Sequence, residues 1–146
     1  ILFSVLQGVR HIFFTGRGAS LAAAGVGGLI VKEATHEHSE GMSSAAFRHG
    51  PFEMLSPEVF VLVFAGDPAA APLNEALVND IRNAGGRACL AATDSGPEPF
   101  RLPEVPSPLR PIVEMLPCQM MSLALAALAG REPGKFDRIT KVTTIE

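Results

Sequence analysis

The sequence predicts an α/β domain, a three-layer αβα sandwich on a parallel sheet of about four to five strands. Strand-like and helix-like segments alternate along the chain, which is the order of a parallel sheet with helical crossovers. The strand-like segments are apolar on both faces, as in sheets that helices cover on both sides. With 146 residues, 47% of them hydrophobic, the chain is long enough for one domain with a substantial core.

Strands are predicted where short apolar runs are bounded by glycine, proline or turn residues. The predicted strands lie at residues 11–15, 58–65 and 87–92. Residues 96–111 hold six prolines and are predicted to be mostly loop, with a short edge strand at residues 100–102. Residues 36–42 are polar, and we predict an irregular segment there.

Helices are predicted from the spacing of apolar residues and from their flanking residues. The predicted helices lie at residues 21–34, 43–47, 72–84 and 112–129. Ser20 is in position to cap the first of them. Gly25, Gly27 and Gly28 weaken that helix by about 1 kcal/mol each relative to alanine, so we expect close backbone packing there. The longest apolar run, residues 120–129, is too short to span a membrane and fits a core helix.

Charge and cysteine content narrow the functional classes. A net charge of −3 and a pI near 5.8 argue against nucleic-acid binding, which needs a basic surface. Cys89 and Cys118 lie in apolar stretches and are interpreted as buried reduced thiols, which fits a cytoplasmic protein without a membrane segment. The chain starts at Ile1, partway through an apolar segment, so we expect a fragment or excised domain.

The segment GRGAS at residues 16–20 follows a predicted strand and opens a predicted helix. Backbone amides at such a helix N-terminus can bind an anion. The candidate ligand-binding residues are Gly16, Arg17, Gly18 and Ser20. The dinucleotide fingerprint is incomplete, because Leu21 stands where its third glycine should be. Anion binding and a tight strand-to-helix turn without a ligand therefore remain alternative interpretations.

Three further residues are candidates for acid–base chemistry. Glu33 ends an otherwise apolar predicted helix, where the helix dipole disfavours its charged form and so favours a proton acceptor. His49 lies in a loop before Gly50-Pro51, and loop histidines are common acid–base groups. Position alone also fits a solvated helix end for Glu33, a surface histidine for His49 and an exposed lysine for Lys141.

A metal site is not expected. The polar residues His36, Glu37, His38 and Glu40 lie close together, but their spacing matches no standard zinc pattern. We therefore interpret this stretch as a polar loop with surface histidines.

Five segments, taken in order, resemble the sugar isomerase (SIS) domain: GRGAS, GGLIVKEATHEHSEG, AAFRHGP, LPCQMMS and ITKVTTIE. The resemblance extends from about residue 11 to residue 146. It is greatest to the second of the two SIS domains in glucosamine-6-phosphate synthase and its relatives, which include SIS-type glucosamine-6-phosphate deaminases and fructosamine-phosphate deglycases. The 16 positions that separate Glu33 from His49 are similar to the separation in that family.

The resemblance implies a role for each acid–base candidate. Glu33 matches the general base that moves a proton between C1 and C2 of the open-chain sugar. His49 matches the histidine that assists ring opening from across a dimer interface, and Lys141 matches the tail lysine that reaches the sugar. The implied ligand is a small sugar phosphate, the implied assembly is a homodimer, and no cofactor is implied.

Two departures from the family pattern refine this expectation. The synthase pattern has a lysine three positions before the base, where this chain has Ile30, and this difference favours a deaminase, deglycase or other isomerase. The KVT sequence at residues 141–143 favours the same group. The family's Ser/Thr-rich phosphate loop corresponds here to residues 64–68 (FAGDP), which carry no hydroxyl.

We therefore expect residues 1–146 to be a single SIS domain, the C-terminal half of a tandem-SIS protein, with a preceding SIS domain that holds the phosphate. The isolated chain is expected to be inactive. The alternative is a sugar-phosphate-sensing SIS module of a transcription regulator, without catalytic activity. Glu33, His49 and Lys141 together favour catalysis, because a sensor needs none of them for chemistry.

Overall fold

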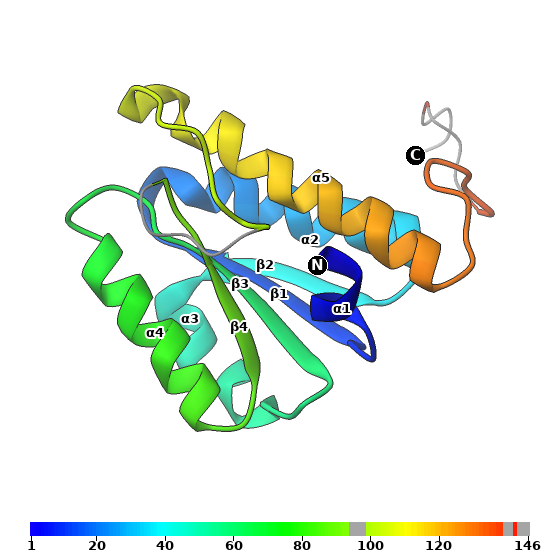
Figure 1. Ribbon diagram of the computed structural model, residues 1–146, viewed down its shortest axis with the longest axis horizontal. Coiled ribbons are helices and arrows are strands. Elements are labelled where there is room, and N and C mark those ends of the chain that lie inside the picture. The colour runs from blue at the N-terminus through cyan, green and yellow to red at the C-terminus, as the bar shows by residue number, and fades with distance from the viewer. Residues whose placement is uncertain (94–98, 139–141, 143–146) are drawn as a thin grey trace.

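A parallel four-stranded sheet forms the centre of the molecule (Figure 1). The structure is a computed structural model that describes residues 1–93, 99–138 and 142. The strand order is β2-β1-β3-β4. The strands are β1 (His11–Gly16), β2 (His38–Ser43), β3 (Val59–Phe64) and β4 (Arg87–Ala91). The predicted α/β class and parallel sheet are confirmed.

Helices cover both faces of the sheet, which gives three layers (Figure 1). On one face lie α1 (Leu2–Leu6), α2 (Leu21–Thr35) and α5 (Arg110–Leu128). On the other face lie α3 (Ser44–Arg48) and α4 (Ala71–Asn83). Short 3-10 helices occupy Gly18–Ser20, Pro51–Met54 and Ser107–Leu109. Alternate residues of β1 enter the two cores, with Phe14 facing α2 and α5 and Phe13 facing α3 and α4.

The prediction of an irregular segment at residues 36–42 is wrong for most of these residues. Residues His38–Ser43 form the edge strand β2, which pairs with β1 from His11↔His38 to Gly16↔Ser43. Its polar composition follows from its edge position, because only Ser39 is fully buried in it. The strand is held by backbone pairing with β1 and by contact with α2, and neither depends on an apolar side-chain pattern.

The glycines of α2 allow the helix to lie close to the sheet, as predicted for two of the three positions. A Cβ atom on Gly28 would lie 2.5 Å from the backbone nitrogen of Gly41 in β2. A Cβ atom on Gly27 would lie 2.8 Å from the ring of Phe14 and 2.9 Å from the Cys118 sulfur. Nothing lies within 4 Å of the equivalent position on Gly25. Close packing is therefore confined to Gly27 and Gly28.

The predicted helix cap at Ser20 is wrong. Ser20 already has helical backbone angles, and its side chain caps no backbone amide. Its hydroxyl instead donates to Oε1 of Glu114 at 2.9 Å, a residue 94 positions later in the chain. The Ser20 hydroxyl therefore bonds to a side chain distant in the sequence instead of to a backbone amide of its own helix.

The apolar helix α5 packs as a core helix. Together with the 3-10 turn before it, it spans Ser107–Leu128 and has the length and hydropathy that a membrane crossing would need. It packs against α2 and α1, and its buried side includes Cys118, Met121 and Leu125. The edge strand expected near residue 100 is reduced to one parallel bridge between Ala92 and Arg101.

Candidate functional site

The segment at residues 16–20 lies at the carboxyl end of β1, where ligands bind in parallel α/β sheets. Gly16 ends the strand, and a Cβ atom there would lie 2.8 Å from the Cβ of Ser20. Gly18 has a φ of +57°, a conformation that favours glycine. Arg17 is half-buried, and its Nε has no hydrogen-bond partner among the residues that the structure describes.

Glu114 is a buried carboxyl beside this segment, and the sequence analysis did not single it out. Its residue is only 1% exposed, and its Oε1 accepts the hydrogen bond from Ser20. Burial raises the pKa of Glu114, while the Ser20 hydrogen bond and the charge of Arg110 act in the opposite direction. Arg110 also donates to the backbone oxygen of Gly66 at 2.8 Å. In the sequence, the only sign of this site is that Glu114 is a lone acidic residue in an apolar helix.

Glu33 lies at the other end of α2, near the amino ends of the strands. Glu33 follows Ser20 by 13 positions, which is about 20 Å along the helix axis. The structure therefore does not bring Glu33 together with the segment at residues 16–20. The two ends of α2 are separate candidate sites within this chain.

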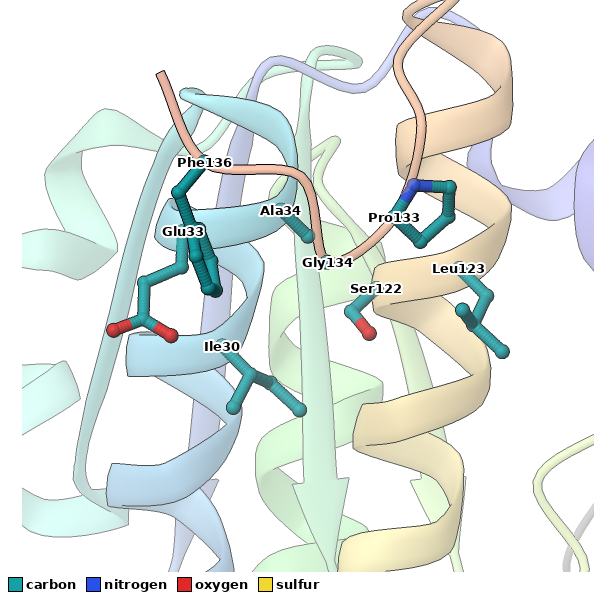
Figure 2. A pocket seen from close by; sticks show the side chains of 8 residues that line it. All are labelled: Ile30, Glu33, Ala34, Ser122, Leu123, Pro133, Gly134 and Phe136. Atoms are coloured by element: carbon teal, nitrogen blue, oxygen red, sulfur yellow. The ribbon is translucent and has the colours of Figure 1, made fainter. Parts of the chain in front are cut away.

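The half-buried Glu33 side chain lines a pocket of about 350 Å³. Figure 2 shows the carboxylate beside the ring of Phe136, on the wall that α2 contributes. The pocket lies between α2, α5 and the segment that follows α5. The other lining residues are Ile30, Ala34, Ser122, Leu123, Pro133, Gly134 and Phe136. A carboxylate on a mainly apolar wall is suited to accept a proton from a bound small molecule.

His49 is on the opposite face of the sheet from Glu33. It follows α3, where its backbone nitrogen donates to Ala46, and it is exposed. The α3 segment is fixed by a hydrogen bond from Ser44 to Asn74 at 2.9 Å and by an ion pair between Arg48 and Asp80 at 2.6 Å. His49 does not line the Glu33 pocket, so one chain does not bring these two candidates together.

The remaining sequence candidates are Lys141 and the histidine-rich stretch. Lys141 lies outside the described residues. Among the residues that are described, no group of three or more metal-ligating side chains is placed to hold a metal ion. His38 pairs with Glu40 at 3.3 Å on the edge strand, while His36 contacts Arg131 at 3.0 Å.

This fold matches a known family and several solved structures. The family profile described as SIS domain matches residues 5–129. The chain belongs to the SIS domain family. The isomerizing glutamine–fructose-6-phosphate aminotransferase of Thermococcus kodakarensis is 33% identical over 99% of this chain and 25% of that protein. The chain thus spans about a quarter of the length of the curated relatives that it matches.

Two solved structures show the same fold. The C-terminal domain of glucosamine-fructose-6-phosphate aminotransferase from Francisella tularensis has a TM-score of 0.79 at 19% identity, over 92% of this chain and 41% of that one. Glucosamine-6-phosphate deaminase from Thermotoga maritima has a TM-score of 0.78 at 16% identity, over 96% of this chain and 45% of that one. The chain therefore matches less than half of either solved chain.

Proposed function

We propose that this SIS domain contributes half of the active site of an amino-sugar phosphate isomerase or deaminase. Glu33 acts as the base that moves a proton between C1 and C2 of the open-chain sugar. The observation that carries the proposal is the Glu33 carboxylate on the wall of an otherwise mainly apolar pocket. The half-buried carboxylate borders this pocket and can act as a proton acceptor for a small molecule bound there.

His49 comes to the Glu33 site from a second copy of the chain. The two side chains lie on helices that cover opposite faces of the sheet, so a single chain cannot supply both to one substrate. In a twofold homodimer, the His49 of each copy assists ring opening at the Glu33 of the other. Lys141, which follows Asp137 by four residues, serves as the cation that faces the developing oxyanion.

A preceding SIS domain supplies the phosphate-binding loop, which makes residues 1–146 the C-terminal half of a tandem pair. An apolar row on α5 supports this proposal, because its members are spaced three or four residues apart and are about half exposed or more. The row consists of Ile112, Leu116, Met120 and Leu123. It has the composition of a surface that packs against another domain.

The reaction that fits best is isomerisation or deamination in the cytoplasm, without a cofactor. Ile30 lines the Glu33 pocket at the position where the synthase pattern has a lysine, so no amine is available there. The relatives described above are aminotransferases by name, and Ile30 is the reason to place this chain with the deaminases, deglycases or other isomerases.

The first test is a Glu33→Gln substitution in the full-length gene product. We expect turnover of sugar phosphate and deuterium exchange at C2 to fall by about 10²- to 10⁴-fold, because the amide cannot accept the proton. Sugar-phosphate binding should change little. Glu37→Gln, an exposed carboxylate four residues later, is the matched control and should keep full exchange. Undiminished exchange by the Glu33 variant would contradict the proposed role.

Mixing two inactive variants tests the shared site. Homodimers of Glu33→Gln and of His49→Ala should each be inactive. A randomly reassembled mixture should recover about a quarter of the normal activity, because half of the dimers carry one intact site. No recovery would place both residues in one chain's site. A protein that binds sugar phosphate but turns none over, with or without these substitutions, would instead be a sensor.

A further inference from the structure

We propose that Arg131 is a positioning residue for the Glu33 site. It ties the end of α2 to the segment that follows α5, and so holds Pro133, Gly134 and Phe136 in place as part of the wall of the Glu33 pocket. The contacts of residues 131–138 are observed in the structure, whereas the effect of Arg131 on turnover rests on the function proposed above.

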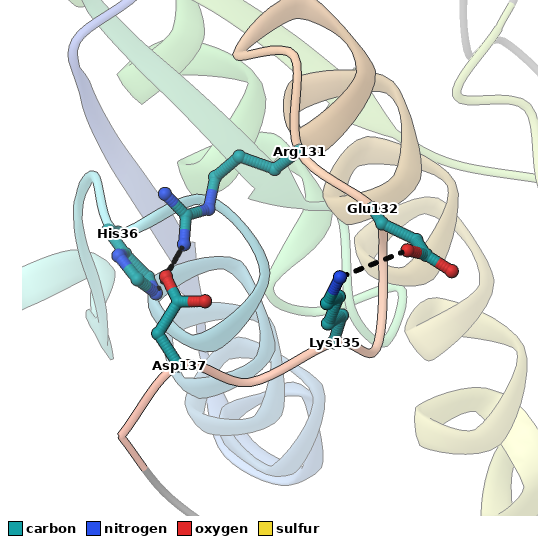
Figure 3. Close-up of polar contacts among 5 residues, drawn as sticks. All are labelled: His36, Arg131, Glu132, Lys135 and Asp137. Atoms are coloured by element: carbon teal, nitrogen blue, oxygen red, sulfur yellow. Dashed lines mark hydrogen bonds and ion pairs between the residues drawn. The ribbon is translucent and has the colours of Figure 1, made fainter.

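The Arg131 cluster consists of His36, Arg131 and Asp137 (Figure 3). Nη2 of Arg131 lies 3.0 Å from Nε2 of His36 and 2.5 Å from Oδ2 of Asp137. A guanidinium group only donates hydrogen bonds, so Nε2 of His36 is the acceptor in this contact. One nitrogen of Arg131 thereby joins two segments that are about 100 residues apart in the sequence.

His36 is a firm anchor for this contact. It ends α2 with a left-handed φ of 60°, and its backbone nitrogen donates to Lys32 at 3.0 Å. The next residue is also held, because the Glu37 nitrogen donates to the Thr35 hydroxyl at 3.0 Å. His36 follows Glu33 by three residues, so the anchor lies within one helical turn of the proposed base.

The other end of the cluster closes a loop against the pocket. Arg131 is fixed at the end of α5 by its backbone nitrogen, which donates to Ala126 at 2.8 Å. Asp137, six residues later, accepts a hydrogen bond from the Arg131 side chain. Between these two points, Pro133, Gly134 and Phe136 line the Glu33 pocket, and the Phe136 ring lies beside the Glu33 side chain (Figure 2).

The cluster also limits where the tail can begin. The ion pair with Arg131 fixes Asp137 near the end of α2, one residue before the described segment ends. Charge agrees with this arrangement, since the hydrogen bond and charge of Arg131 lower the pKa of Asp137.

The same loop contains a second ion pair that serves as a matched control. Lys135 and Glu132 are 3.9 Å apart, and their side chains are 72% and 76% exposed. Neither residue lines the Glu33 pocket. Exposed pairs of this kind contribute little, so its removal should leave the loop in place.

The structural test is amide hydrogen exchange over residues 131–138 in the full-length protein. Arg131→Ala should speed exchange of this segment by about two- to tenfold, because the side-chain contacts of Arg131 with His36 and Asp137 are lost. His36→Gly should speed exchange in the same way while preserving the left-handed helix end. Lys135→Ala should leave the exchange rate unchanged. An unchanged rate in the Arg131→Ala protein would overturn the proposal, whatever the function of Glu33.

The kinetic test separates positioning from folding. Arg131→Ala should lower kcat by about 10- to 100-fold and change KM by less than about threefold, because the phosphate is held elsewhere. Arg131→Lys keeps the charge opposite Asp137 and should recover part of kcat. An Arg131→Ala protein with normal kcat would refute the positioning role. If Arg131→Ala speeds exchange but the unsubstituted protein turns over no sugar phosphate, the proposed function is refuted. The structural role of the Arg131 cluster then still holds.

Discussion

The two faces of the sheet are held together by different means. On the α2–α5 face, the layers approach so closely that Gly27 and Gly28 leave no room for a side chain, and Glu114 is buried with one hydrogen-bonded oxygen. On the α3–α4 face, the layers are fixed by polar contacts at Asn74 and by the edge-to-face rings of Phe13 and Phe47. The first face leaves no room for side-chain volume at two helical positions, and the second has buried hydrogen bonds at Asn74 beside its apolar core.

This difference matters for the two proposed catalytic residues. The long helix α2 fixes Glu33 through its contacts with the sheet and α5. The five-residue helix α3, which carries His49 at its end, is too short to be stable by itself. His49 therefore depends on the contacts that hold α3, which include the buried ring of Phe47 and the hydrogen bond from Ser44 to Asn74. Gly28 on the first face tests close packing, and Asn74 on the second tests buried hydrogen bonds.

The largest effect is expected at Gly28. Gly28→Ala should lower the free energy of unfolding by about 3 kcal/mol, because the new Cβ meets the backbone of β2 rather than a movable side chain. Gly25→Ala in the same helix is the control. It meets nothing within 4 Å and should stabilise by about 0.5–1 kcal/mol. Urea unfolding measures both, and similar values for the two would contradict close packing of α2 on β2.

A somewhat smaller loss is expected at Asn74, on the other face. Its fully buried side chain donates to the Phe64 and Ala65 carbonyls and accepts from Ser44. Asn74→Ala should cost about 2 kcal/mol, because these buried groups lose their partner. Asn83→Ala, at an exposed site on the same helix, should change stability by less than about 0.5 kcal/mol. The two variants are compared by chemical denaturation.

The substitution Glu114→Gln should have a smaller effect that depends on pH. Because burial raises the pKa of Glu114 in the folded state, folding favours the protonated form. The stability that Glu114 contributes is complete below its unfolded-state pKa, near 4.5, and is lost as the pH rises through the folded-state value. The variant should therefore gain stability relative to the unsubstituted protein between pH 4 and pH 8. A constant difference across this range would show that Glu114 titrates normally.

The sequence was sufficient for elements that a local pattern defines. The strands β1, β3 and β4 were predicted to within one or two residues, because their apolar runs end at turn residues. The strand β2 was missed because pairing with β1 and the approach of α2, rather than its own polar sequence, make it a strand. The helix α5 begins two residues earlier than predicted, at Arg110, despite the prolines around it.

The candidate site was predictable only in part, for a related reason. Glu33 and His49 became candidates through the order and spacing of motifs, which are local features. The pocket wall formed by Pro133 and Phe136 comes from a segment about 100 residues after Glu33, and no periodicity connects the two. The partnership of Ser20 with Glu114 is equally distant in sequence, which explains why a local cap was predicted in its place.

The smallest effect is expected at the ion pair that joins α3 to α4. Arg48 and Asp80 are 2.6 Å apart, but their side chains are 36% and 47% exposed. Arg48→Ala should therefore lower the free energy of unfolding by only about 0.5 kcal/mol, with a similar coupling energy in a double-mutant cycle with Asp80→Ala. His49 adjoins Arg48, so in the full-length protein the same variant should impair the proposed ring-opening step more than stability. A loss of activity no larger than that of Lys135→Ala would show that the ion pair between Arg48 and Asp80 does not help to position His49.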